Sequence, residues 1–326
     1  MKKVLSHVMV AVQITLVSTS LLCLTINNRM FSQISSENVE RHFIANARAA
    51  ALGDGIVADA TDVTCMYWNP SSLSFLRERS IVLNYSLERI RGRDNLMNEN
   101  IVISLLHEKE WTVGLGATYS HVGHIESGSS LAGYSFNQGS LDLALATALS
   151  RFFSIGILST IRRGQVGSRN STVGSFALGM MYYPSPEISY GLSYQGIGDR
   201  IDYSFDPLRF QTSPIKTRLS QSLQVGVTTR FNALADRPTV VLAGVSQKIF
   251  GIDGFIYKAG IEGWPSNFLA LRIGYWVGTE TVAARYGGGL RLGPWQLDYA
   301  ISTTELEPQF HQASLSYSFS SQSLRR

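Results

Sequence analysis

Between residues 80 and 320 the chain repeats one pattern, in which apolar and polar side chains alternate over about ten residues. In Trp111–Ser120, for example, the odd-numbered residues are apolar or aromatic and the even-numbered ones are Thr, Gly or Ser. A period of two places these sets on opposite faces of a β-strand. An apolar row with an aromatic residue at each end is typical of a transmembrane β-barrel, in which one face meets lipid and the other meets the lumen.

We count about fourteen such segments, an even number as expected of a bacterial single-chain barrel. The segment near 238–249 alternates least well. The segments lie near residues 80–87, 101–105, 111–120, 139–149, 152–163, 172–183, 187–197, 218–231, 238–249, 254–262, 268–278, 282–292, 295–304 and 312–320. Their connections in the first half alternate between long and short, which predicts outer loops at Glu88–Glu99, Val122–Gln138 and Asp199–Thr217.

The composition agrees with a β-rich membrane protein. Only 16% of the 326 residues are charged, against roughly 25% in soluble domains. The alternative is a soluble all-β sandwich or propeller, but rows of Ser, Gly, Gln and Arg would make a poor sandwich core. The net charge of +4 is scattered, so no basic stripe for nucleic acid is present.

The first 32 residues are typical of an export signal. Lys2-Lys3 precede an apolar run, Val8–Ile26, and a polar stretch leads to Ser32, after which we expect cleavage. An uncleaved transmembrane anchor is the alternative, since the run is near the lower length limit for spanning. Cleavage would remove Cys23 and leave Cys65 alone, so we expect no internal disulfide.

One stretch outside the pattern, residues 45–73, does not alternate. It begins with the small residues Ala47–Ala51, turns at Gly53-Asp54-Gly55 and ends at Tyr67–Pro70. Both glycines can adopt positive φ without strain, and the proline pushes Asn69 out of the helical region. A compact, non-strand segment before a series of strands predicts an insert folded inside the barrel.

This stretch resembles the N-terminal segment of the FadL-like outer-membrane barrels, and most of all their PorV/PorQ branch. The shared features are the Ala47–Ala50 run, the glycine turn, an acidic patch at Ala58–Asp62 and the Tyr67–Pro70 close. The chain departs from the family at Ser71-Ser72, where Ala-Gly is usual, and at Gly-Asp-Gly, where a Gly-Gly pair is common. The plug-motif residues are Gly53, Gly55, Asp59, Asp62, Trp68, Asn69 and Pro70.

The resulting prediction is an all-β protein: a transmembrane antiparallel β-barrel of about 14 strands with a short N-terminal plug inside the lumen. We assign residues 1–32 to the signal peptide, 33–79 to the plug, 80–320 to the barrel and 321–326 to a polar tail. The expected location is the bacterial outer membrane. Because buried backbone groups need partners, we expect lumenal Arg and Asp rows to supply them, with Asp54, Asp59 and Asp62 facing inward Arg side chains.

The strand pattern also sends apolar side chains into the lumen. They would either pack against the plug, which we favour, or line a pocket for a greasy ligand. The inward charged set has a plain explanation in mutual salt bridges and water. The candidate ligand-lining residues are Leu106, Leu158, Met181, Tyr183, Ile256, Phe268, Arg272 and Trp276.

The resemblance implies a barrel that binds a hydrophobic or amphipathic small molecule and passes it inward by diffusion, with lumenal Arg groups meeting an anionic head. The alternative is a PorV-type component of type IX protein secretion that engages cargo or partner proteins through its outer loops. For that role the candidate contacts are Tyr203, Phe205, Leu208 and Phe210. The expected partners are therefore membrane lipid, a hydrophobic ligand and secretion proteins, with no nucleic acid.

No enzyme motif is present: the sequence has no Gly-x-Ser-x-Gly elbow and no phosphate loop. An outer-membrane hydrolase would lack a credible pair of nucleophile and base. His121 and His124 fall in a predicted outer loop, and two ligands do not make a zinc site. Cys65 is expected to be a small buried residue. We therefore predict a protein that is not an enzyme and has no cofactor or metal.

Overall fold

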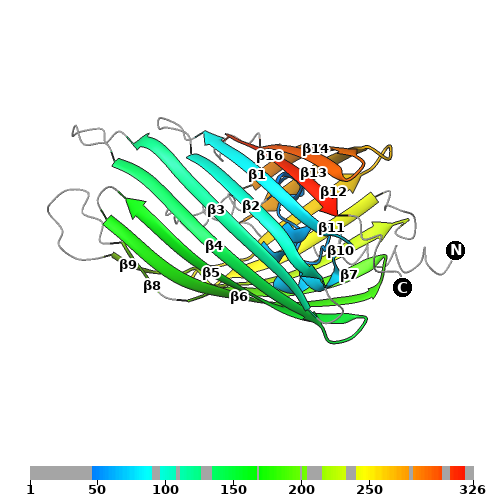
Figure 1. Cartoon of the computed structure of the whole chain (residues 1–326), viewed down its shortest axis with the longest axis horizontal. Coiled ribbons are helices and arrows are strands. Elements are labelled where there is room, and N and C mark those ends of the chain that lie inside the picture. The colour runs from blue at the N-terminus through cyan, green and yellow to red at the C-terminus, as the bar shows by residue number, and fades with distance from the viewer. Residues whose placement is uncertain are drawn as a thin grey trace. The chain divides into compact units, whose positions relative to one another are not determined.

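The computed structural model describes residues 46–89, 96–107, 111–125, 134–166, 169–198, 200–203, 215–232, 240–278, 282–302 and 309–319. These residues form a closed antiparallel barrel of fourteen strands (Figure 1), which confirms the predicted fold class. The predicted signal peptide, residues 33–45 and the polar tail lie outside the described residues.

Each barrel strand pairs with its neighbour in sequence, except that β7 pairs with β10, and β1 pairs with β16 to close the ring. The strand bounds are β1 Arg79–Arg89, β2 Leu96–His107, β3 Trp111–Ile125, β4 Tyr134–Ala148, β5 Phe153–Val166, β6 Arg169–Ser185, β7 Ile188–Gly198, β10 Ser222–Phe231, β11 Val240–Ile249, β12 Ile256–Gly263, β13 Leu269–Val277, β14 Val282–Leu292, β15 Trp295–Ser302 and β16 Gln309–Phe319.

Two features differ from the sequence prediction. The long connection after β7 contains a two-stranded sheet, β8 (Arg200–Tyr203) paired with β9 (Ile215–Arg218), which the loop prediction missed. The connection after β3 also begins later than predicted, because that strand continues to Ile125. The poorly alternating segment near 238–249 does form a strand, β11.

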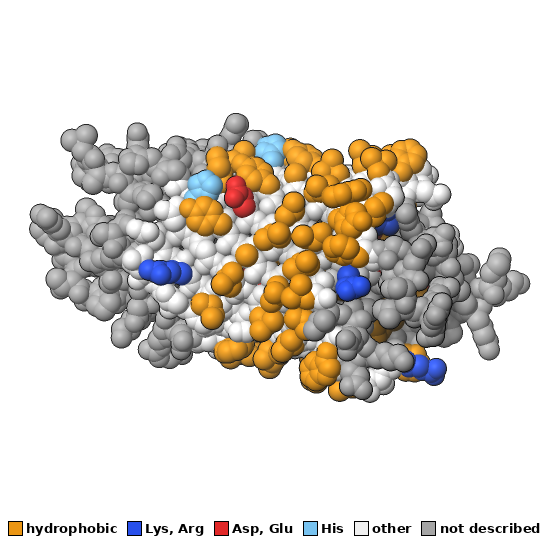
Figure 2. Space-filling view, viewed as in Figure 1, with side chains coloured by type: hydrophobic (Ala, Val, Ile, Leu, Met, Phe, Trp, Pro, Cys, Tyr) orange, Lys and Arg blue, Asp and Glu red, His pale blue; other side chains and the backbone are white. Residues whose placement is uncertain are grey.

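The two faces of the barrel follow the predicted parity. On the outer face Leu115, Leu192 and Ile273 are 37%, 39% and 47% exposed. Their sequence neighbours Gly116, Ser193 and Arg272 are buried on the inner face. In Figure 2 the apolar side chains gather in a broad band across the strands, with the few visible charged side chains toward its margins. The barrel therefore presents an apolar belt outside and a mixed, mostly polar surface inside.

Residues 46–76, which we call the inner segment, lie inside the barrel and contact strands around its circumference (Figure 1). The segment contains a short α-helix, α3 (Ala47–Ala51), and two 3₁₀-helices, η1 (Val63–Tyr67) and η2 (Pro70–Phe75). In the described part of the chain, no helix has the length and apolar character needed to cross a membrane.

Each of these short helices begins at a side chain that accepts a backbone N–H, as helix N-caps do. The capping residues are Asn46, Asp62 and Asn69. The turn after α3 places Gly53 and Asp54 at positive φ, 65° and 58°. Gly55, which could adopt positive φ without strain, does not do so, and Asp54 takes the second left-handed position.

Candidate functional site: the inner segment and the lumen around it

The inner segment fits against the wall because the facing strands carry glycine where it passes. A Cβ added to Gly156 would lie 2.5 Å from the Ser71 nitrogen, and one on Gly260 would lie 2.5 Å from the Leu52 carbonyl oxygen. Both separations are shorter than real Cβ atoms show. Eight inward glycines lie next to the inner segment in this way, and we call them the glycine socket. They are Gly116, Gly156, Gly179, Gly191, Gly226, Gly260, Gly274 and Gly287.

The glycine socket was missed in the sequence, although a signal for it exists. Its members occupy inward positions on β3, β5, β6, β7, β10, β12, β13 and β14, so the parity that separates the faces also selects them. Three cross-strand pairs are both glycine: Gly156 with Gly179, Gly191 with Gly226, and Gly260 with Gly274. Paired inward glycines indicate that another part of the backbone approaches the wall closely.

Apolar contacts hold the two halves of the inner segment. Val63, Met66 and Leu73 pack in one buried cluster with Val82, Val102 and Leu158 of the barrel. Leu52, Val57 and Trp68 form a second cluster with Val245. These contacts remove apolar surface from water, which is the main favourable contribution to such packing.

Lumenal Ser and Gln side chains satisfy the buried backbone of the inner segment. Ser314 Oγ accepts from the Ala47 N–H at 2.6 Å, and Ser189 Oγ donates to the Ala58 carbonyl at 2.6 Å. Gln195 Nε2 donates to the carbonyls of Tyr67 and Trp68 at 3.0 and 2.9 Å. At these backbone groups the partners are Ser and Gln side chains rather than the Arg and Asp rows expected from the sequence.

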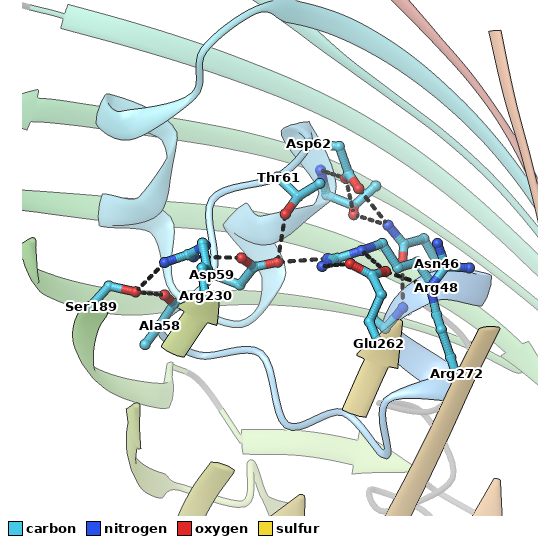
Figure 3. A network of polar contacts seen from close by, with 12 residues as sticks. Asn46, Arg48, Ala58, Asp59, Thr61, Asp62, Ser189, Arg230, Glu262 and Arg272 are labelled. Carbon is cyan, nitrogen blue, oxygen red and sulfur yellow. Dashed lines mark hydrogen bonds and ion pairs between the residues drawn. The ribbon is translucent and has the colours of Figure 1, made fainter. Parts of the chain in front are cut away.

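A chain of buried ion pairs crosses the lumen through the inner segment (Figure 3). Asp59 accepts from Arg230 of β10 at 2.7 Å and from Arg48 of α3 at 2.6 Å. Arg48 also binds Glu262 of β12 at 2.8 Å. The chain continues to β13 and β15, where Arg272 joins Glu262 at 2.6 Å and Asp298 at 2.7 Å.

Three guanidinium groups thus alternate with three carboxylates, so the chain carries no net charge. Burial alone would raise the pKa of Asp59, but the charges of Arg48 and Arg230 hold it well below its ordinary value. Burial would likewise lower the pKa of Arg48, yet Glu262 and Asp59 raise it. Each buried charge is therefore stabilised by the opposite charges beside it, and loss of one group would leave its partner uncompensated.

Of the three aspartates expected to face inward Arg side chains, two do so and one does not. Asp54 binds Arg285 of β14 at 2.6 Å, and Asp59 binds Arg230, as expected. Asp62 instead accepts from the Asn46 amide and from Thr64, and caps η1. Burial raises the pKa of Asp62. Its role is to join the starts of α3 and η1.

Asn69 and Pro70 end the predicted motif, at the point where η2 begins. The Asn69 side chain is fully buried, and its oxygen accepts from the N–H and hydroxyl of Ser71. Its amide donates to the Val57 carbonyl at 3.0 Å and to the Met180 carbonyl of β6 at 2.9 Å. One side chain therefore caps η2, fixes the preceding turn and anchors both to the wall.

Most candidate ligand-lining residues hold the inner segment or its ion pairs. Leu158 belongs to the first apolar cluster, and Met181 is buried. Tyr183 stacks on Phe75 at 5.2 Å between ring centroids. Trp276 lies beneath the Arg285 guanidinium, and Arg272 is paired as described. Packing against the inner segment, the alternative favoured from the sequence, accounts for Leu158 and Tyr183, whereas Trp276 and Arg272 contact residues of neighbouring strands.

The other three candidates fare differently. Ile256 is half-buried at an inward position of β12. Phe268 immediately precedes β13, and its side chain is 55% exposed. Leu106 lies in β2, but its side chain lies outside the described residues.

Only one of the four predicted outer-loop contacts lies among the described residues. Tyr203 ends β8, while Phe205, Leu208 and Phe210 lie outside the described residues. His121 and His124 lie in β3 rather than in a loop, and His121 stacks on Tyr119. Cys65 is a free, buried thiol, and burial raises its pKa. Among the described residues no cluster of three His, Cys, Asp or Glu side chains could hold a metal.

No protein-family model matches the sequence, and no curated protein matches it. Solved structures do share the fold. The toluene transporter TbuX of Ralstonia pickettii aligns with a TM-score of 0.64 at 12% identity, over 84% of this chain and 97% of that one. The toluene transporter TodX of Pseudomonas putida gives 0.60 at 13% identity, over 84% and 97%. A FadL homologue of Pseudomonas aeruginosa gives 0.58 at 12% identity, over 85% and 98%.

Proposed function

We propose that this chain is a FadL-like barrel of the bacterial outer membrane that binds a hydrophobic or amphipathic small molecule and passes it inward without catalysis. The observation that carries the proposal is a closed fourteen-stranded barrel with an apolar outer belt and a packed N-terminal segment in its lumen. The shared fold with TbuX and TodX, both described as toluene transporters, supports the same function.

The inner segment gives the transport hypothesis its mechanism. An eight-stranded barrel can be filled by its own side chains, whereas larger barrels enclose space. Here the inner segment occupies that space and is held by buried ion pairs and capping bonds. We infer that it acts as a plug, blocks a continuous water-filled pore and leaves passage to solutes that bind beside it.

Uptake into cells tests this function. The chain would be expressed in a Gram-negative host whose own hydrophobic-compound barrels have been deleted, and uptake of labelled toluene and of a labelled sugar would be followed. Faster toluene uptake with unchanged sugar uptake is the expected result. Toluene uptake no faster than in the host carrying an unrelated barrel would reject the proposal.

The assignment to the PorV/PorQ branch and the role in type IX secretion stay predictions. They depend on the side chains of the loop around 203–210, which lie outside the described residues. The signal peptide stays a prediction for the same reason. Purification of the full chain from its membrane with its neighbours would test the secretion role directly.

A further inference from the structure

The lumen wall beside the inner segment carries polar groups that no neighbour uses. Asn84 of β1 and Asn100 of β2 face each other directly in the strand register, and both are 5% exposed. The Asn84 nitrogen Nδ2, the Asn100 oxygen Oδ1 and the Ser86 hydroxyl are buried without a hydrogen-bond partner. Leaving such groups unpaired costs free energy, so native structures rarely do so without a reason.

Each of the two amides is bonded at one end and left over at the other. Asn84 Oδ1 accepts from Gln312 Nε2 at 3.0 Å and from Ser314 Oγ at 2.9 Å, which leaves its NH₂ free. Asn100 Nδ2 donates to Thr118 Oγ1 at 3.1 Å and to the Tyr67 hydroxyl at 3.2 Å, which leaves its carbonyl free. A free donor and a free acceptor therefore lie at directly opposed positions of adjacent strands.

The position of this amide pair ties it to the plug. One inward position before it, Val82 and Val102 pack in the apolar cluster with Val63 and Met66 of the inner segment. Tyr67, which ends η1, accepts from Asn100 and donates to Asp142 of β4 at 3.1 Å. A molecule at the amide pair would thus touch apolar surface on one side and the inner segment on the other.

The charged groups of the lumen argue against an anionic head group. The guanidinium groups of Arg48, Arg230 and Arg272 each contact a carboxylate, and Arg285 contacts Asp54. A carboxylate ligand would have to compete with these buried acids. It would also approach Asp142, whose carboxylate accepts from Tyr67 and Thr160 beside the amide pair. These four Arg side chains are therefore already paired and do not support the sequence expectation of Arg groups meeting an anionic head.

We propose that Asn84, Ser86 and Asn100 form a recognition site for a neutral hydrogen-bonding group, an amide or a hydroxyl, on an otherwise apolar ligand. This inference rests on the proposed function and narrows its substrate class. An amide offers an acceptor to Asn84 Nδ2 and a donor to Asn100 Oδ1 at once. A bare hydrocarbon satisfies neither, and a carboxylate offers no donor to Asn100.

Four compounds with one ring test the site: benzamide, benzyl alcohol, toluene and benzoate. Each would be titrated calorimetrically into the full chain in lipid nanodiscs, with the heat of empty nanodiscs subtracted. Two added hydrogen bonds should make benzamide bind about tenfold more tightly than toluene, with benzyl alcohol between them and benzoate weakest.

Two variants locate the effect, and one serves as a control. Ser86→Ala removes an unpaired hydroxyl that takes part in no described hydrogen bond of another residue, and Asn84→Asp keeps the oxygen that Gln312 and Ser314 need while replacing the free NH₂ by a second oxygen. Both should reduce the preference for benzamide and benzyl alcohol over toluene by about threefold or more. Ser193→Ala, an inward serine of β7, should leave the preference unchanged.

The outcomes separate the two proposals. If toluene enters cells but all four compounds bind alike, or benzoate binds best, the amide pair is not a recognition site and transport stands. If both variants retain the full benzamide preference, ordered water holds these atoms and the inference is overturned. If no compound binds and toluene uptake is also absent, both proposals fail together.

Discussion

At the scale of single residues, Asp59 decides whether the ion-pair chain holds. It is the only carboxylate described between Arg48 and Arg230, and Arg48 alone continues the chain to Glu262. Removing one partner of a buried ion pair costs about 3–5 kcal/mol, because the other charge is left uncompensated. Loss of the Asp59 carboxylate would therefore leave two buried guanidinium groups, those of Arg48 and Arg230, without this partner.

This arrangement predicts an acid-sensitive inner segment. The pKa of Asp59 is lowered in the folded chain, so its contribution is complete above the ordinary aspartate pKa of about 4 and is lost as the pH falls toward the lowered value. Cleavage within the inner segment by pepsin should therefore increase from about pH 4 downward. Asp59→Asn should be cleaved readily at every pH tested, and a pH dependence equal to that of the unaltered chain would contradict the assignment.

At the scale of a strand, neighbouring residues belong to different environments. Lys at Leu115, Leu192 or Ile273 should impair assembly, because a charge on the lipid face near the bilayer centre costs about 2–4 kcal/mol. Lys at Ser175, a half-buried inward position of β6 beside Thr160, should be tolerated better. The measurement is the folded fraction from heat-modifiable gel migration, and equal losses at both parities would refute the membrane orientation.

The glycine socket makes a second prediction at this scale. Gly156→Ala should destabilise the barrel by about 1–3 kcal/mol, because the new methyl group meets the backbone of Pro70 and Ser71. Gly174→Ala is the control: this glycine lies on the outer face of adjacent β6, where an added Cβ meets nothing within 4 Å. Urea unfolding in detergent would measure the difference, and equal effects would show that the inner segment does not press on the wall.

These elements also show what the sequence could and could not predict. Alternation predicts the fourteen strands and both faces, because a period of two is a local property of the chain. The ion-pair partners of Asp54 and Asp59 lie 231 and 171 residues away. Such pairs depend on strand register and on the path of the inner segment, which no local pattern records. Asp62 differs, because its partners Thr64 and Asn46 lie only 2 and 16 residues away, so a local capping pattern could have indicated them.

At the scale of the whole molecule, the inner segment should decide whether the barrel conducts. Deleting residues 45–73 removes all three short helices except the end of η2, and with them the side chains packed in the lumen. A deletion variant that inserts into planar bilayers should therefore show a conductance that the intact chain lacks. A variant that inserts normally and stays silent would show that this segment is not a plug.

The bond between Ala47 and Ser314 has a consequence for the order of assembly. Ala47 lies at the start of the inner segment, and Ser314 lies in β16, the strand that meets β1 at the seam of the barrel. The inner segment also fits into a socket formed by strands from both halves of the chain. A closed ring leaves the segment no sideways route into the lumen, so we expect the strands to assemble around the inner segment before the ring closes. On this view, seam formation is the last step, and a loosened inner segment slows closure before it weakens the finished barrel.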